Sequence, residues 1–172
     1  MTYKKIFIIV FVIIAAFYVF KVKGFNPFEK KIKSDIILTA LDGKKMSLDE
    51  CTGENGTVFF IMGTWCPYCS REVEQIKTLN DFFKSNKINV LIGMKGNTYE
   101  EIQSWVSRHD FPWNWKTFYW FNAYEKDFNI DINRVPYLVI RNKNGKMTFN
   151  KSGTLHYKHI SELAQDMLKS NN

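Results

Sequence analysis

The chain has 172 residues, about the length of one domain, which is enough to bury a substantial hydrophobic core. Hydrophobic residues make up 45% of it and charged residues 24%, a balance that excludes a disordered polar chain, and three cysteines are too few for a small disulfide framework. Seven lysines and a single acid, Glu29, lie in the first 33 residues, so most of the formal charge of +7 belongs to that segment. Because the rest is nearly neutral, we predict no nucleic-acid partner.

The first element in the chain is an apolar stretch over residues 6–22, in which Lys21 is the only charge. A membrane-spanning helix needs about 20 apolar residues, and the apolar part of a secretory signal has about 7–15. No small-residue cleavage site and no lipid-accepting cysteine follows the stretch. We therefore expect an uncleaved signal anchor, one transmembrane helix over residues 1–23, with a cleaved signal peptide as the alternative. Residues 24–33 are expected to form a linker.

Residues 34–172 alternate predicted strands and helices, a pattern typical of an α/β domain with a central sheet. Continuous apolar runs indicate strands buried on both faces, and apolar residues at helical spacing indicate helices with one side on the sheet. In chain order we expect a hairpin over 36–41 and 44–48, a strand over 57–62, a helix from about Cys66 through Phe82 or Phe83, a strand over 88–93, a helix behind a capping box at Thr98–Glu101, a short helix over 122–128, a hairpin over 137–141 and 146–149, and a closing helix over 160–168.

The most informative motif is Cys66-Pro67-Tyr68-Cys69, at the point where a buried strand ends and a helix begins. Proline is favoured at the first position of a helix, so Cys66 is expected at the helix N-terminus with Cys69 one turn on, within bonding reach. The helix dipole and the free N–H groups there stabilise a thiolate. We therefore expect Cys66 to be the nucleophile that attacks a disulfide, and Cys69 to resolve the mixed disulfide.

A pair of cysteines can also bind a metal ion or form a structural disulfide. Half of a zinc site is disfavoured, because the chain has no second pair and no histidine at a suitable spacing, and we predict no metal ligands. A structural disulfide across four residues would add little stability. Cysteine pairs also bind soft copper, so a Cu(I)-handling metallochaperone stays open as an alternative. A binding module with an idle active site is a second alternative.

The segment Gly63–Cys69 resembles the active-site segment of thioredoxin-fold thiol-disulfide oxidoreductases, and Asn133–Tyr137 resembles their cis-proline loop. The resemblance implies a thioredoxin-like fold, a central mixed sheet flanked by helices. It also implies that Pro136 is cis and packs against the cysteine pair, and that Val135 pairs with the substrate backbone. The expected substrate-binding residues are Trp65, Pro67, Tyr68, Val135 and Pro136.

The N-terminal hairpin, the segment around Thr98 to Trp113 and Asn144-Gly145-Lys146 are similar to the membrane-anchored TlpA/ResA-like branch of that family. This resemblance implies a tethered domain that faces out of the cytoplasm, in a branch where many members are reductants and some act in cytochrome c maturation. A literal count of the lysines that flank the anchor would keep the domain in the cytoplasm, but long domains translocate largely regardless of flanking charge. The chemistry of the cysteine pair therefore decides the orientation, with the domain outside.

We therefore expect a single-pass protein of the cytoplasmic (inner) membrane, anchored through residues 6–22, with its domain on the extracytoplasmic, periplasmic side. Its expected activity is that of a protein-disulfide oxidoreductase, acting as a reductase on protein substrates, with a disulfide-donating oxidase as the alternative. Electrons are expected to pass to or from a membrane partner. No organic cofactor is implied, because the Cys66–Cys69 dithiol carries the electrons.

The sequence departs from thioredoxin in one respect that concerns proton transfer. Thioredoxin has a buried acid six residues before its first active-site cysteine, and here that position is Phe60. A proton acceptor for the resolving thiol must come from elsewhere or be water. Glu72 and Glu74 follow Cys69 by one turn, and we expect both on a solvated helix face. The third thiol, Cys51, is expected to be a free, buried cysteine.

Overall fold

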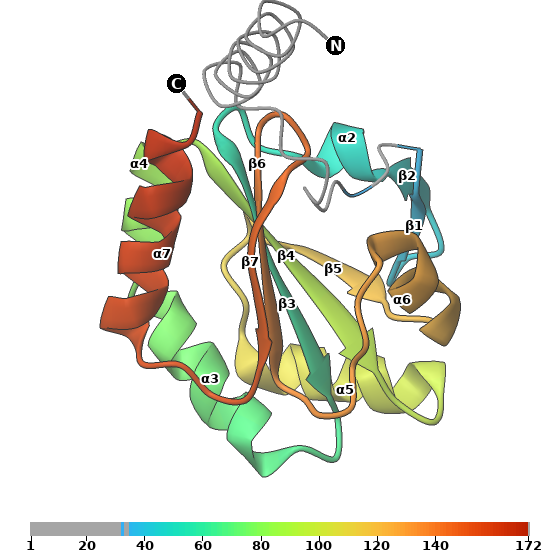
Figure 1. The fold of residues 1–172 in the computed structure, drawn as a ribbon. Helices are drawn as coiled ribbons and strands as arrows, with labels where there is room; N and C mark the ends of the chain where they lie inside the picture. The colour runs from blue at the N-terminus through green and yellow to red at the C-terminus, as the bar shows by residue number, and fades with distance from the viewer. Residues whose placement is uncertain (1–31, 33–34, 172) are drawn as a thin grey trace, which may run out of the picture.

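The computed structural model describes residue 32 and residues 35–171 (Figure 1). The expected anchor over residues 1–23 and the linker over 24–33, apart from Ile32, lie outside the described residues. Among the helices that are described, none has the length and apolar character that crossing a membrane requires.

The described residues form a seven-stranded mixed sheet in the order β2-β1-β5-β4-β3-β6-β7. The central strands β3, β4 and β5 run parallel, whereas β6 and β7 on one side and β1 and β2 on the other are antiparallel to their neighbours. The strands are β1 (Ile37–Ala40), β2 (Lys45–Ser47), β3 (Gly56–Gly63), β4 (Ile88–Lys95), β5 (Lys116–Tyr119), β6 (Tyr137–Asn142) and β7 (Met147–Ser152). This arrangement, with helices on both faces, confirms the predicted thioredoxin-like α/β fold.

Helices cover the two faces of the sheet and enclose one hydrophobic core on each. The helices are α2 (Leu48–Cys51), α3 (Pro67–Lys77), α4 (Asn80–Ser85), α5 (Tyr99–His109), α6 (Asn122–Phe128) and α7 (Tyr157–Lys169). Buried side chains of α3, α4, α5 and α7 join one core, and those of α2 and α6 join the other. Figure 1 shows α3 and α7 at the left of the sheet and α2 and α6 at the right.

Strand β3 lies between β4 and β6 and is buried over all eight residues, which explains its mostly apolar sequence. Side chains alternate along a strand. Phe60 and Met62 therefore pack in the core that contains α3, whereas Phe59 and Ile61 pack in the core that contains α6. The strand that leads into α3 is therefore packed in both hydrophobic cores of the domain.

The predicted helix from Cys66 to Phe83 is wrong in one respect, because it is divided in two. The Thr78 hydroxyl donates a hydrogen bond to the Gln75 carbonyl at 2.7 Å, which competes with continuation of the helix. The Leu79 N–H bonds to the Ile76 carbonyl at 2.9 Å, three residues back, and so tightens the last turn of α3. Helix α4 then starts afresh and carries the buried Phe83.

Candidate functional site

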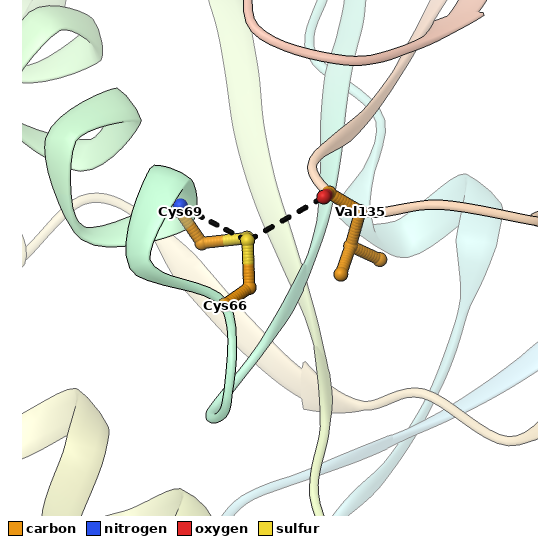
Figure 2. Close-up of a disulfide and its surroundings, with 3 residues drawn as sticks. All are labelled: Cys66, Cys69 and Val135. Carbon is orange, nitrogen blue, oxygen red and sulfur yellow. Dashed lines mark hydrogen bonds between the residues drawn. A yellow bond between two sulfur atoms is a disulfide. The ribbon is translucent and has the colours of Figure 1, made fainter.

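The cysteine pair lies where β3 turns into α3. Cys66 is the N-cap residue of α3, with an extended backbone (φ −95°, ψ 107°), and Pro67 follows at the start of the helix. The two cysteines are joined in a disulfide with their Cα atoms 5.3 Å apart. The Cys69 N–H donates to the Cys66 sulfur at 3.1 Å (Figure 2). In the reduced state this donor and the helix dipole favour a thiolate at Cys66.

The proline loop faces the cysteine pair. The Val135–Pro136 peptide bond is cis, as the resemblance to the thioredoxin fold implies. The Val135 carbonyl oxygen lies 3.4 Å from the Cys66 sulfur, as Figure 2 shows. Pro136 is buried, and its carbonyl accepts a hydrogen bond from the Gly153 N–H at 2.8 Å. The loop is therefore held between the active-site sulfur and the segment that leads into α7.

An open hollow of about 470 Å³ surrounds the Cys66 sulfur, and we call it the active-site groove. It is lined by all five of the expected substrate-binding residues together with Cys66, Arg134, Gly153 and Thr154. Trp65 and Tyr68 are 58% and 54% exposed, which is unusual for large hydrophobic side chains. Cys69, by contrast, is fully buried, so a substrate reaches the pair only through Cys66.

Two contacts fix the turn that leads into the pair. A Cβ atom at Gly63 would lie 3.0 Å from the Trp65 ring and 3.2 Å from a methyl of Val135, so a larger residue there would require these side chains to shift. The Thr64 hydroxyl donates a hydrogen bond to the Glu101 carboxylate, which also accepts from the Asn97 N–H at 3.1 Å.

The predicted capping box at Thr98–Glu101 is therefore only half formed. Thr98 accepts from the Glu101 N–H at 3.1 Å, as expected. The Glu101 side chain bonds chiefly to Thr64 and to the Asn97 N–H, and the Thr98 backbone is the smallest of the contacts that lower its pKa. The hydrogen bond from Thr64 is the main cause that lowers the pKa of Glu101.

The Glu72 side chain is buried (2% exposed), whereas the sequence predicts a solvated helix face for it. Burial raises the pKa of its carboxyl to about 7, and a hydrogen bond from the Leu155 N–H at 3.2 Å opposes the rise. Its second carboxylate oxygen is buried without a hydrogen-bond partner among the described residues. Glu74 is exposed, as predicted, and pairs with Lys77 at 3.0 Å.

A signal in the sequence could have identified Glu72. Residues 69, 72, 73 and 76 fall on one face of a helix, and the other three are apolar. All four are buried against the sheet. Phe60, at the position of the thioredoxin acid, is buried in the same core as the cysteine pair. The chain therefore has its buried acid on the helix instead of on the strand.

Cys51 is a free and fully buried thiol, as predicted, in the core on the other face of the sheet. Burial raises its pKa, so it is not an activated nucleophile. Within the part of the chain that the structure describes, no group of three or more His, Cys, Asp or Glu residues is placed to hold a metal ion.

The sequence model of the Redoxin family matches residues 26–166. The chain belongs to the Redoxin family. It is a thioredoxin-fold thiol-disulfide oxidoreductase, which confirms the family recognised from Gly63–Cys69 and Asn133–Tyr137. No curated protein sequence matches this Redoxin chain closely enough to count as a relative.

Solved structures support the fold of this Redoxin domain. A thioredoxin-family thiol:disulfide interchange protein from Chlorobium tepidum is 15% identical with a TM-score of 0.68, covering 81% of this chain and 97% of its own. A secreted thiol-disulfide isomerase from Corynebacterium glutamicum is 14% identical with a TM-score of 0.69, covering 80% and 85%. A secreted Mycobacterium tuberculosis disulfide oxidoreductase is 15% identical with a TM-score of 0.62, covering 77% and 96%.

Proposed function

We propose that this chain is a membrane-anchored reductase that exchanges disulfides with extracytoplasmic protein substrates through Cys66 and Cys69. The observation that carries the proposal is the arrangement of the two sulfurs. Cys66 lines the active-site groove at a helix N-terminus and is 6% exposed there, whereas Cys69 is fully buried one turn behind it. An accessible thiolate with a shielded partner is the arrangement that a two-step exchange needs.

In the proposed reaction the Cys66 thiolate attacks one sulfur of a substrate disulfide. The substrate's S–S bond breaks, its second sulfur leaves as a thiolate, and a mixed disulfide with Cys66 forms. The Cys69 thiol then loses its proton and attacks the Cys66 sulfur, which releases the first substrate sulfur. The substrate gains two electrons and ends as a dithiol, and the domain ends with the Cys66–Cys69 disulfide.

The groove presents the backbone of Val135 beside Cys66, so an extended substrate segment can pair with it as an added strand. Trp65, Pro67 and Tyr68 form the opposite wall and would contact the side chains of that segment. No organic cofactor enters this scheme, because both electrons are held by the sulfurs.

Glu72 is the proton acceptor that we assign to Cys69. It lies one turn further along α3, at the i+3 position where side chains of a helix are neighbours. A base works best when its pKa is near the ambient pH, and burial raises the pKa of Glu72 to about 7. It has the role that the sequence analysis gives to the buried acid of thioredoxin, which lies at the position of Phe60.

The compartment and the partners are part of the proposal. Residues 6–22 would anchor the chain in the cytoplasmic membrane, and the domain would face the extracytoplasmic side. Two of the similar structures belong to proteins described as secreted, which supports that side. After each turnover the disulfide must be reduced again, so a membrane electron donor is implied. A reporter fused after Asn172 that is active only in the cytoplasm would overturn this topology.

The decisive measurement is the equilibrium potential of the Cys66–Cys69 pair in the full chain, set with glutathione buffers and followed by the emission of Trp65. A value near that of thioredoxin, about −270 mV, is expected of a reductase, whereas a value near about −120 mV would show an oxidant that donates disulfides. Failure to form the disulfide at any ratio of reduced to oxidised glutathione would refute the redox function. Stoichiometric Cu(I) binding without turnover would then favour the metallochaperone.

Single-cysteine variants test the assigned roles. Cys69→Ala keeps the nucleophile and removes the resolving thiol, so it is expected to accumulate a mixed disulfide with a protein substrate. Cys66→Ala is expected to accumulate none. Cys51→Ala is the matched control, because that thiol is buried on the other face of the sheet, and it should exchange disulfides as the unchanged chain does.

A further inference from the structure

The active-site groove has one basic side chain. Arg134 is the residue immediately before Val135, it is exposed, and it lines the groove. The other described residues that line the groove include no Asp, Glu, Lys or His. The residue adjacent to the substrate-pairing backbone is therefore a cation that lines the same groove as Cys66.

A second cation lies outside the groove. The Arg71 guanidinium lies 4.8 Å from the centre of the Tyr68 ring, a cation–π contact. Arg71 belongs to α3, whereas Arg134 belongs to the proline loop. Arg71 does not line the groove, so Arg134 is the charged side chain that a segment bound there would meet.

The acids that are close in sequence do not offset these charges. Glu72 is buried and accepts from Leu155, and Glu74 pairs with Lys77. Asp131, three residues before Arg134, accepts from the Asn133 amide at 3.1 Å and lines a separate hollow beside Glu125 and Tyr137. These acids therefore have other partners, and the charge of Arg134 stays available at the groove.

We propose that Arg134 selects substrate polypeptides that carry an acidic side chain next to the reacting cysteine. The proposal rests on the proposed function, because it concerns the substrate of the same site. A segment that pairs with the Val135 backbone and has its cysteine at the Cys66 sulfur brings its adjacent residue beside Arg134. An Asp or Glu there forms an ion pair with the guanidinium, and a Lys there is repelled. Trp65 and Tyr68 accept the apolar residues of the same segment.

The test uses three cyclic peptides of identical sequence, each closed by a disulfide, with Glu, Gln or Lys next to one cysteine. The rate constant for reduction by the full-length reduced chain is divided by that for a small dithiol, which removes the intrinsic effect of the charge on the disulfide. An exposed ion pair is worth about 0.2–1 kcal/mol, so we expect the Glu peptide to react about 1.4- to 5-fold faster than the Gln peptide. The advantage should shrink at high salt.

Variants of the chain identify the residue responsible. In Arg134→Gln the Glu and Lys peptides should react at equal normalised rates, and in Arg134→Glu the order should be reversed. Arg108→Gln is the matched control, because Arg108 is exposed on α5 and does not line the groove, and it should keep the preference of the unchanged chain.

An unchanged preference in Arg134→Gln would overturn this inference and leave the proposed function intact. Equal rates for the three peptides with the unchanged chain would do the same. If the cysteine pair cycles with glutathione but reduces none of the peptides, polypeptide selection by the groove is refuted. If the pair cycles with neither, the proposed function itself fails, and this inference fails with it.

Discussion

Replacement of Glu72 by Gln is expected to make the stability of the protein less dependent on pH. In the folded chain burial raises the pKa of this carboxyl from an ordinary 4.5 to about 7. Below pH 4.5 the group is protonated in both the folded and the unfolded chain. Between pH 4.5 and about 7 the unfolded chain releases the proton while the folded chain retains it, so the free energy of unfolding falls as the pH rises. Above pH 7 that loss is complete.

The size of the loss follows from the two pKa values. A tenfold change in proton affinity is worth about 1.4 kcal/mol, so the difference between 4.5 and about 7 corresponds to about 3 kcal/mol. Glutamine has nearly the same shape and cannot ionise, and its oxygen can still accept the hydrogen bond from Leu155. Its amide is a buried donor with a cost of its own, but that cost is the same at every pH and cancels in the comparison.

The assay is urea unfolding of the oxidised protein at pH 4.5 and pH 8. The difference in the free energy of unfolding, Glu72→Gln minus the unchanged chain, should become more favourable to the variant by about 3 kcal/mol between the two pH values. Glu74→Gln is the matched control on the same helix, and its difference should stay nearly constant because that carboxylate is exposed. A Glu72→Gln difference that does not change with pH would refute the reasoning.

Three further predictions follow from other residues. Cys51→Ser places a hydroxyl in an apolar core and should lower the free energy of unfolding by about 1–3 kcal/mol in urea, with the potential of the active-site pair unchanged; a shifted potential would contradict its structural role. Gly93→Ala puts a Cβ 2.8 Å from the Trp120 ring and should lower the same free energy by about 1–3 kcal/mol, whereas full stability would mean that the core can yield there. Thr64→Val removes the donor that chiefly lowers the pKa of Glu101, so that pKa should rise toward its ordinary value in an NMR titration, and an unmoved pKa would assign the effect to Asn97.

Much of the fold could be predicted because its signals are local. The buried strands β3 and β4 are mostly apolar runs, and the short helix Asn122–Phe128 begins and ends where the sequence indicates. The cysteine pair and the cis bond before Pro136 were identified by short motifs, which need no knowledge of distant contacts.

The strand β5, Lys116–Tyr119, was missed because its signal is not local. The segment Trp113–Phe121 is aromatic almost throughout, so no alternation marks the four residues that form the strand. What defines β5 is its pairing, parallel to β4 and antiparallel to β1. The aromatic residues of this segment also differ in exposure, which the sequence does not indicate. Phe118 is fully buried, whereas Trp113 is 87% exposed.

The burial of Glu72 was missed for a different reason. A charged residue on an apolar helix face is more often at the solvent edge of that face than inside it. Here the segment that follows β7 passes over the carboxylate and supplies the Leu155 N–H. That segment is 83 residues further along the chain, so the sequence around Glu72 carries no trace of it.

Because the proposed proton acceptor lies on α3, it shares one helix with the resolving thiol. In an arrangement with the acid on a strand, the distance between acid and thiol depends on how the strand and the helix dock. Here Cys69 and Glu72 share one helix, so their separation is set by its pitch and survives any rigid movement of α3. Residues 66–72 therefore hold the nucleophile, the resolving thiol and the proposed acid at a fixed spacing, while the burial and the Leu155 N–H that set the pKa of the acid come from other parts of the chain.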